Sequence, residues 1–405
     1  MLLVYQMQAK ACGYHIMVKF QAVHNLVQSA VDAAFPAAQL VIRLHGDVVF
    51  DECYGFLDPE TRQYPTTSNT HFDLASVSKL FTVTAFMSLV SEGRVQLDQP
   101  VCEVLTQFTG QRVIAPQPDP LGSGATIEIV PPTNALVDVS AVTFRQLLAH
   151  TSGLPAWLPL WKLARELHNN STASTEIQRQ LHMTALQTIF AYPTGSQVVY
   201  SDVGLILIGL AVSQLAQQPL DVVVRQRITQ PLGLPSIGYG PIPCEQAAPT
   251  EFYLHQNKRM CGEVHDENAW ALNGIAGHAG LFGNARDVAA FGESLRMSPA
   301  GATHASPLPQ NILREMTTLQ AQDGDVRRGI GFALWSPNLR AMSNPLNQSS
   351  FGHLGFTGTS LWVDPERELT FACLTNHIYY GREGEDTMTP FRNALSRAVV
   401  EAIDG

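Results

Sequence analysis

The feature that most constrains this chain is a helical pattern that begins near Ser76, ends at Gly93 and is apolar nearly all round. It carries Leu80, Phe81, Val83, Ala85, Phe86, Met87, Leu89 and Val90. A helix that is apolar on every side must be buried within a core. The chain has 405 residues, which is long enough to build a sizeable core and to form two domains.

Strand patterns occur at both ends of the chain, and helical patterns occupy the middle. Residues 40–44 and 48–54 predict a hairpin, and residues 351–363 and 368–375 predict a second pair of strands. Helical patterns cover 20–34 and most of the stretch from 143 to about 230, with a capping box at Thr143 and Gln146 and an N-cap at Asn284. We therefore expect an α+β fold, in which helices flank one antiparallel sheet and a mostly helical domain is inserted.

We expect the sheet domain to combine residues 17–98 with 285–405, and the inserted domain to span 99–284. A cleft at their junction is a usual place for an active site. Residues 1–16 are expected to be a non-structural extension. Residues 111–132 are rich in Pro and Gly and are expected to be irregular.

Composition excludes several classes of partner. The net charge is -10 and no basic stripe is present, which argues against nucleic acid. The longest apolar run, 203–212, is about half the ~20 residues that a membrane helix needs. The N-terminus is a poor signal peptide, so we expect a cytoplasmic protein, or an extracytoplasmic one if the start site is misassigned. Reduced thiols are expected for the six scattered cysteines: Cys12, Cys53, Cys102, Cys244, Cys261 and Cys373.

The start of the apolar helix carries a Ser-x-x-Lys pattern, Ser76 to Lys79. Residues three apart share one face of a helix, so the two side chains should meet. A serine hydroxyl beside a buried lysine ammonium can be activated as a nucleophile. The pattern therefore indicates a serine acyl-transfer enzyme acting on a small molecule or a short peptide.

Other catalytic patterns are missing from the sequence. It has no G-x-S-x-G turn, no H-E-x-x-H and no G-x-x-x-x-G-K-[ST], and its 13 histidines show no metal-ligand spacing. We therefore predict that the reaction needs no metal and no cofactor.

Three ordered stretches resemble the class C β-lactamase-related serine hydrolases: 72–101, 143–155, and Tyr200-Ser201-Asp202-Val203-Gly204. That superfamily also includes penicillin-binding proteins, D-alanyl-D-alanine carboxypeptidases and family VIII esterases. Residues 262–270, 277–282 and 352–360 are similar to a penicillin-binding-protein-like branch. The resemblance extends from about residue 20 to the C-terminus and implies the β-lactamase/transpeptidase-like fold.

The resemblance assigns roles to the second motif, which is usually Tyr-x-Asn. Tyr200 is implied to share a proton with Ser76 and Lys79, and the nearby cation is expected to lower the pKa of the phenol from about 10. Asp202 replaces the usual asparagine, and its negative charge is expected to disfavour the binding of anions in the pocket. Which of Lys79 and Tyr200 is the immediate base stays open.

The third motif is usually Lys-Thr-Gly, and here it aligns with His353-Leu354-Gly355. His353 is expected to donate a hydrogen bond to substrate, and Gly355 to allow substrate close to the strand. The backbone N–H groups of Ser76 and Phe356 would form the oxyanion hole. By the same resemblance Asn376 would line the far end of the pocket. His278 would either lie at the rim of the cleft or be a packing histidine beside Gly277 and Gly280.

The sequence therefore predicts a serine hydrolase that acts through an acyl-enzyme on small esters or on D-alanyl peptides and amides. Asp202 and His353 argue against strong β-lactamase activity. A weak β-lactamase and a non-catalytic penicillin-binding-protein-like binding module are the alternatives. The sequence does not indicate an oligomeric state.

Overall fold

Both ends of the chain meet in one eight-stranded antiparallel sheet, as the sequence predicts. The computed structural model describes residues 19–118, 126–127, 135–253, 257–296, 306–382 and 386–405. In spatial order the strands are β12 (Ala321–Asp323), β13 (Val326–Arg328), β14 (Ala333–Leu334), β15 (Phe351–Leu354), β16 (Ser360–Asp364), β17 (Leu369–Thr375), β1 (Ala37–Leu44) and β2 (Asp47–Gly55). In this register Val41 of β1 lies opposite Ala372 of β17, so the first long strand pairs with the last.

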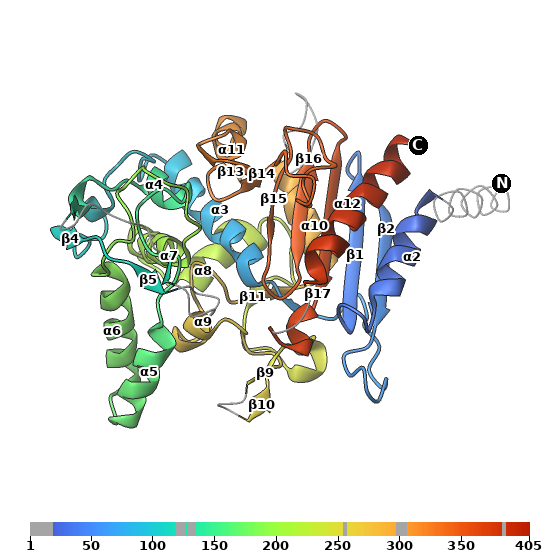
Figure 1. The fold of residues 1–405 in the computed structure, drawn as a ribbon, viewed down its shortest axis with the longest axis horizontal. Helices are drawn as coiled ribbons and strands as arrows, with labels where there is room; N and C mark the ends of the chain where they lie inside the picture. The colour runs from blue at the N-terminus through green and yellow to red at the C-terminus, as the bar shows by residue number, and fades with distance from the viewer. Residues whose placement is uncertain (1–18, 119–125, 128–134, 254–256, 297–305, 383–385) are drawn as a thin grey trace.

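Helices cover both faces of this sheet (Figure 1). On one face α2 (Gln21–Ala30) and α12 (Met388–Asp404) pack over Leu40 and Ile42, whereas α10 (Ala285–Leu295) packs on the other face with Val41. Successive strand side chains point to opposite faces, which is why adjacent residues belong to two separate cores. The predicted N-cap of α10 is confirmed, because the Asn284 side chain accepts from the N–H of Asp287 at 3.0 Å.

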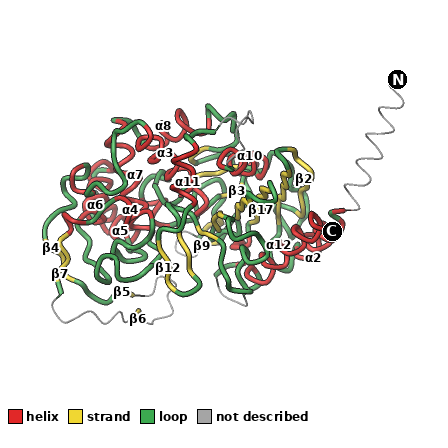
Figure 2. Tube along the Cα trace, turned by 90° about the horizontal axis from the view of Figure 1, so that it is seen from above, coloured by secondary structure: helices red, strands yellow, loops and turns green. Residues whose placement is uncertain are grey.

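The apolar helix predicted from the sequence is α3 (Ser78–Ser91), and every residue from Ser78 to Leu89 is buried. It runs between the sheet and the helical part of the molecule, where Phe81 stacks on Phe291 at 3.9 Å between ring centroids. Helices α4–α8 gather at the end of the molecule away from the sheet (Figure 2). The remaining helices are α4 (Phe144–Leu148), α5 (Leu160–Asn169), α6 (Ser174–Leu186), α7 (Asp202–Ala216), α8 (Leu220–Val224), α9 (Glu267–Ala271) and α11 (Gln310–Thr317).

Short strands complete the fold. The middle strand of a three-stranded sheet is β11 (Leu281–Gly283), with β3 (Phe72–Asp73) and β8 (Gly238–Tyr239) beside it. The stretch expected to be irregular contains, in its described part, β4 (Gln111–Val113), β5 (Gln117–Pro118) and β6 (Thr126–Ile127), and β4 pairs with β7 (Leu136–Asp138). A further pair is β9 (Phe252–Tyr253) with β10 (Lys258–Arg259). The capping box at Thr143 is confirmed, and the expected extension 1–16 lies outside the described residues.

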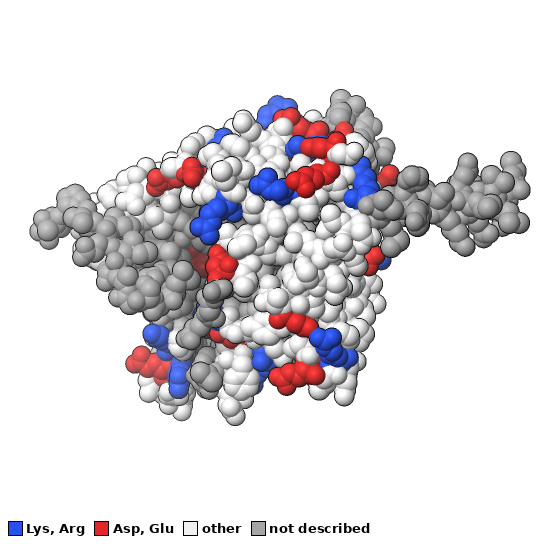
Figure 3. Space-filling model, turned by 45° about the vertical axis from the view of Figure 1, so that its right-hand side comes forward, with Lys and Arg blue, Asp and Glu red and all other residues white. Residues whose placement is uncertain are grey.

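The surface in Figure 3 carries Lys and Arg side chains interspersed with Asp and Glu. Within the described ranges, no single helix is long and apolar enough to cross a membrane. Helix α7 and the segment Leu220–Thr229 pass a length and composition test only as a pair, and that pair is bent by 77°. Most of α7 is buried in the core. The domain boundaries stay a prediction.

Candidate active site

A strand, a tight turn and a helix present Ser76. Strand β3 leads into a single 3-10 turn, Ala75–Val77, and α3 starts directly after it. The Asp73 carboxylate fixes this turn by accepting from the N–H of Ala75 at 2.8 Å and from the N–H of His265 at 2.6 Å. Ala75 has φ +45°, in the left-handed region that L residues avoid. Strain of this kind is held in place by the surrounding structure and is often found at functional sites.

Lys79 meets Ser76 as the helical spacing predicts. Its Nζ donates to Ser76 Oγ at 2.8 Å and to the backbone oxygen of His278 at 2.9 Å. It also forms an ion pair with Asp202 at 2.8 Å, and only 1% of the Lys79 side chain is exposed. Asp202 and the backbone oxygen of His278, which come from other elements, therefore hold the ammonium against the Ser76 hydroxyl.

The charges around Lys79 favour its protonated form. Burial alone would lower the pKa of Lys79, but the Asp202 carboxylate and Tyr200 outweigh burial and raise that pKa to about 12. Burial raises the pKa of Tyr200, with Lys79 opposing and Asp202 adding to the rise. The expectation of a lowered phenol pKa is therefore wrong for the protein without substrate. The low-polarity surroundings of the hydroxyl outweigh its neighbouring cation.

Tyr200 lies two residues before the start of α7 and faces Lys79, whose Nζ is 5.0 Å from the centroid of the phenol ring. Its hydroxyl oxygen is buried and makes no hydrogen bond of ordinary geometry to the described residues. The rings of His150 and His353 pack against it at 4.7 and 5.8 Å between centroids. The phenol is thus available to a substrate or to Ser76.

His353 differs from its expected role as a hydrogen-bond donor. Its Nδ1 lies 2.7 Å from the backbone oxygen of Leu354, which can only accept, so Nδ1 carries the proton. Burial, together with the charges of Lys79 and Arg328, lowers the pKa of His353 to about 3. The ring is neutral and its buried Nε2 is a lone-pair acceptor without a partner. It therefore does not offer a substrate carboxylate the cation or donor that a lysine would.

The turn after β15 is fastened to the nucleophile segment by two threonines. Thr357 Oγ1 donates to the backbone oxygen of Asp73 at 2.8 Å, and Thr359 Oγ1 donates to that of Leu74 at 2.9 Å. Arg392 of α12 donates to the backbone oxygens of Gly355 and Thr359 at 2.7 and 3.1 Å. These contacts hold the turn after β15 against the segment that leads to Ser76.

Phe356 is 47% exposed and its ring stacks on His265 at 5.7 Å. A cavity of about 390 Å³ lies beside it, with Ala34, His377 and Arg382 among its lining residues. The N–H of Phe356 has no acceptor among the described residues. Its assignment to the oxyanion hole stays a prediction.

Asn376 is used differently from what the sequence predicted, and His278 follows the packing alternative instead of the rim position. The Asn376 side chain accepts from the N–H of Ala37 at 3.0 Å and donates to the oxygen of Pro249 at 2.8 Å, so its amide is already occupied by backbone groups. His278 is 1% exposed and therefore does not lie at a rim. Its ring Nε2 lies 2.8 Å from Asp266 Oδ1, and its backbone oxygen holds Lys79. Both residues therefore stabilise groups around the site and do not line its pocket.

The sequence is similar to those of known proteins. The family model described as Beta-lactamase matches residues 23–389. This chain belongs to the beta-lactamase family. It is 26% identical over 389 residues to a protein of Salmonella agona named "Putative D-alanyl-D-alanine carboxypeptidase", covering 88% of this chain and 83% of that protein.

Solved structures share the predicted fold. A penicillin-binding protein homologue from Caulobacter crescentus has a TM-score of 0.68 and 19% identity, covering 95% of this chain and 97% of that one. EstCE1, described as a hydrolase with promiscuous acyltransferase activity, has a TM-score of 0.67 and 22% identity, covering 95% and 100%. The expected β-lactamase/transpeptidase-like fold is confirmed.

Asp202, Asp266 and His278 bring three potential metal-ligating atoms within 4.8 Å of one another in this beta-lactamase-family protein. Lys79 Nζ lies 2.8 Å from Asp202 Oδ1 and 2.9 Å from the backbone oxygen of His278. An ammonium therefore already provides positive charge for this cluster. Burial alone would raise the pKa of Asp266, but His278 and a backbone N–H lower that pKa below its ordinary range.

Two further residues lie at the site: His150 belongs to the stretch 143–155 that carries the resemblance and was expected to shape a turn near the cleft, whereas Arg328 carried no sequence signal. His150 is buried, its Nδ1 accepts from the N–H of Ser201 at 3.1 Å, and burial lowers its pKa well below 6.5. Arg328 ends β13, and its guanidinium carbon lies 5.4 Å from the centroid of the Tyr200 ring. Both come from elements distant in sequence, so no local pattern links them to Ser76.

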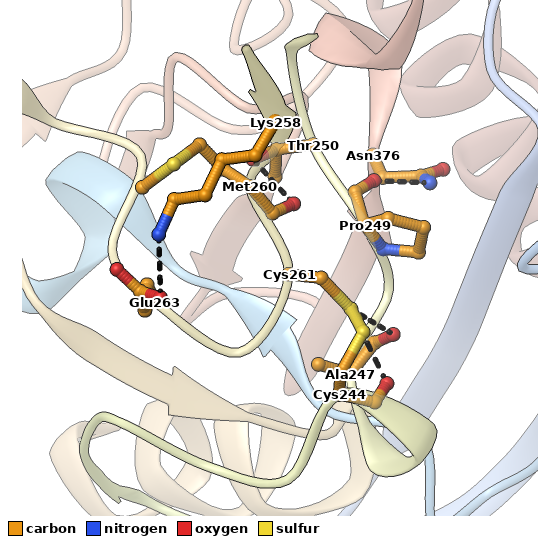
Figure 4. The surroundings of a disulfide bond; sticks show 9 residues. All are labelled: Cys244, Ala247, Pro249, Thr250, Lys258, Met260, Cys261, Glu263 and Asn376. Carbon is orange, nitrogen blue, oxygen red and sulfur yellow. Dashed lines mark hydrogen bonds and ion pairs between the residues drawn. A yellow bond between two sulfur atoms is a disulfide. The ribbon is translucent and has the colours of Figure 1, made fainter. Parts of the chain in front are cut away.

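A disulfide joins Cys244 to Cys261 in the segment that leads to His265 (Figure 4). The expectation of reduced thiols is therefore wrong for these two residues, which carry no spacing signature. Cys53, Cys102 and Cys373 are free, and Cys12 lies outside the described residues. The loop closed by the disulfide contains Pro249, whose backbone oxygen accepts from Asn376. The disulfide thus restrains a loop that packs against the end of β17.

Proposed function

We propose that this beta-lactamase-family hydrolase uses Ser76 to form an acyl-enzyme from small esters or from D-alanyl peptides and amides. The observation that carries the proposal is the 2.8 Å contact between Ser76 Oγ and the buried Lys79 ammonium. The name of the Salmonella relative supports the peptide class, and that of EstCE1 supports a broader acyl-transfer chemistry.

In the proposed mechanism Ser76 Oγ attacks the substrate carbonyl carbon, and its proton passes to Lys79 or Tyr200. The oxyanion accepts hydrogen bonds from the N–H groups of Ser76 and Phe356. Collapse of the tetrahedral intermediate expels an alcohol or amine, which Tyr200 protonates. Water then attacks the acyl ester, and the same groups return the proton to Ser76.

The protonation states constrain this mechanism. With the pKa of Lys79 raised to about 12 and that of Tyr200 raised by burial, both groups hold their protons at neutral pH. Activity should therefore increase toward alkaline pH, as one of them becomes a base. A neutral, acceptor-only His353 supports an esterase or peptidase over a strong β-lactamase.

The test compares the wild type with Ser76→Ala on p-nitrophenyl acetate and butyrate, nitrocefin and a D-Ala-D-Ala peptide. Ser91→Ala is the matched control, because Ser91 lies at the exposed end of the same helix. We expect hydrolysis of at least one substrate, lost in Ser76→Ala and kept in Ser91→Ala. Equal activity in Ser76→Ala would contradict the mechanism. Labelling of Ser76 by a fluorophosphonate separates an enzyme from the non-catalytic binding module.

The disulfide supports a location in an oxidising compartment, the alternative to the cytoplasmic expectation. We propose that Cys244 and Cys261 are joined in the cell. Alkylation of acid-quenched cells, with and without prior reduction, tests this. Two additional alkylated cysteines after reduction support the proposal, and equal labelling contradicts it.

A further inference from the structure

Arg328 is a cation at the active site, and no carboxylate of the described residues forms an ion pair with it. Its guanidinium lies over the ring of Tyr200, at 5.4 Å from the centroid. Its Nε is buried without a hydrogen-bond partner, and among the described residues no carboxylate pairs with this side chain. A buried donor without an acceptor is costly, and a bound group that accepts from it is one way in which that cost is met.

The neighbouring cations have partners, although the Nε of Arg392 is, like that of Arg328, buried without one. The Lys79 ammonium is paired with Asp202 at 2.8 Å, and Arg392 donates to two backbone oxygens of the turn after β15. Arg327, the residue before Arg328 on β13, instead lies over Trp335 and donates to its backbone oxygen. Of these cations, Arg328 alone combines proximity to Tyr200 with donors that no described residue accepts.

The other groups around Tyr200 do not serve an anion. His353 presents an unprotonated Nε2, whose lone pair would repel a carboxylate. His150 uses its Nδ1 to accept from a backbone N–H and is buried. Asp202 is itself negative. An anionic group of the substrate near Tyr200 would therefore find its donors on Arg328.

We propose that Arg328 binds a carboxylate on the leaving-group side of the substrate, so that the site selects esters or amides whose leaving group is acidic. The proposal rests on the proposed function, in which Tyr200 protonates the leaving group. A guanidinium matches a carboxylate with two parallel N–H···O bonds, which a lysine or a neutral histidine cannot form. Arg328 is thus a specificity-determining residue supplied by β13 rather than by the third motif.

The test uses 3-acetoxybenzoate and 3-acetoxybenzamide, which carry the same acetyl group and differ in the charge of the leaving group. We expect the wild type to prefer the acid in kcat/KM by about 10- to 100-fold. Arg328→Gln should reduce that preference to about onefold while p-nitrophenyl acetate is still hydrolysed. Arg327→Gln, which removes the same charge from the adjacent residue, should keep the preference. Equal kcat/KM values in the wild type, or a preference that survives Arg328→Gln, would overturn the proposal.

A binding measurement separates this proposal from the proposed function. 3-Hydroxybenzoate should raise the Tm of the wild type and of Arg327→Gln, but not that of Arg328→Gln, while 3-hydroxybenzamide should leave all three unchanged. If ester hydrolysis fails and this shift is seen, the carboxylate site stands without the enzyme. If Ser76-dependent hydrolysis is seen and the shift is not, the carboxylate site is refuted and the enzyme stands.

Discussion

Replacing Asp202 with asparagine should move the activity of this protein toward lower pH. Asp202 lies 2.8 Å from the buried Lys79 ammonium, and its charge is the largest contribution that raises the pKa of Lys79. The ordinary value is 10.5 and the value in the protein is about 12. That difference corresponds to about 2 kcal/mol of preference for the charged lysine.

Without the carboxylate, burial continues to lower the pKa of Lys79, so the value should fall below 10.5. At a given pH the unprotonated fraction of Lys79 then rises by about 30-fold or more. Asp202 also raises the pKa of Tyr200, so the direction is the same if Tyr200 is the base. The rising limb of kcat/KM against pH should therefore move to lower pH by more than about one unit.

The assay is p-nitrophenyl butyrate hydrolysis from about pH 6 to pH 10, with the Ser76→Ala rate subtracted. Asp221→Asn is the matched control, because Asp221 also lies in the first turn of a helix, α8. A rising limb at the wild-type position in Asp202→Asn would refute the reasoning.

The same substitution should cost stability. The pKa of Lys79 is raised on folding, so the ion pair stabilises the protein fully below about pH 10.5, and this contribution is lost as the pH rises through about 12. At pH 7 we expect a loss of about 2 kcal/mol in the free energy of unfolding. Urea denaturation at pH 7 measures it, and an unchanged midpoint would contradict the ion pair.

Three further predictions concern the surroundings of the site. Gly355→Ala should lower kcat by about 10- to 100-fold. A Cβ at this position would lie 2.0 Å from Thr359 Oγ1 and 2.7 Å from the backbone oxygen of Leu74, so the turn after β15 would have to move away from the nucleophile segment. A kcat equal to that of the wild type would contradict this close approach. The double variant C244S/C261S should have a free energy of unfolding about 3 kcal/mol lower than that of the wild type. In urea denaturation, a reducing agent should destabilise the wild type and leave the double variant unchanged. Burial lowers the pKa of His353 to about 3. The stability that the neutral His353 ring contributes is therefore present above about pH 6.5 and is lost as the pH falls toward 3. When Tm is measured against pH over that range, His353→Gln should lose less stability than the wild type.

Local patterns predicted the scaffold and the nucleophile pair well. The all-round apolar character of α3 required its burial, and the helical period placed Ser76 and Lys79 together, as the 2.8 Å contact confirms. Caps at Thr143 and Asn284 depend on residues three apart and are equally readable from sequence. These features are set by interactions within a few residues.

Features that depend on long-range packing were missed. The direction of the Tyr200 pKa shift follows from desolvation, which no sequence pattern measures. Arg328 reaches the phenol from a short edge hairpin, and Cys244 finds Cys261 without a spacing signature. The Asn376 amide was assigned to the pocket by resemblance, but the structure uses it to join backbone segments.

The placement of β1 between β2 and β17 determines when this protein can finish folding. Val41 and Ala372, which face each other in that register, are about 330 residues apart in the chain. At a synthesis rate of about 5–20 residues per second, β1 leaves the ribosome some 15–70 seconds before its partner strand. Until then the β1–β2 hairpin exposes an apolar edge that attracts other chains. Nascent chains of this protein should therefore depend on chaperones that bind near the N-terminus, and truncation before β17 should give aggregates rather than a smaller folded enzyme.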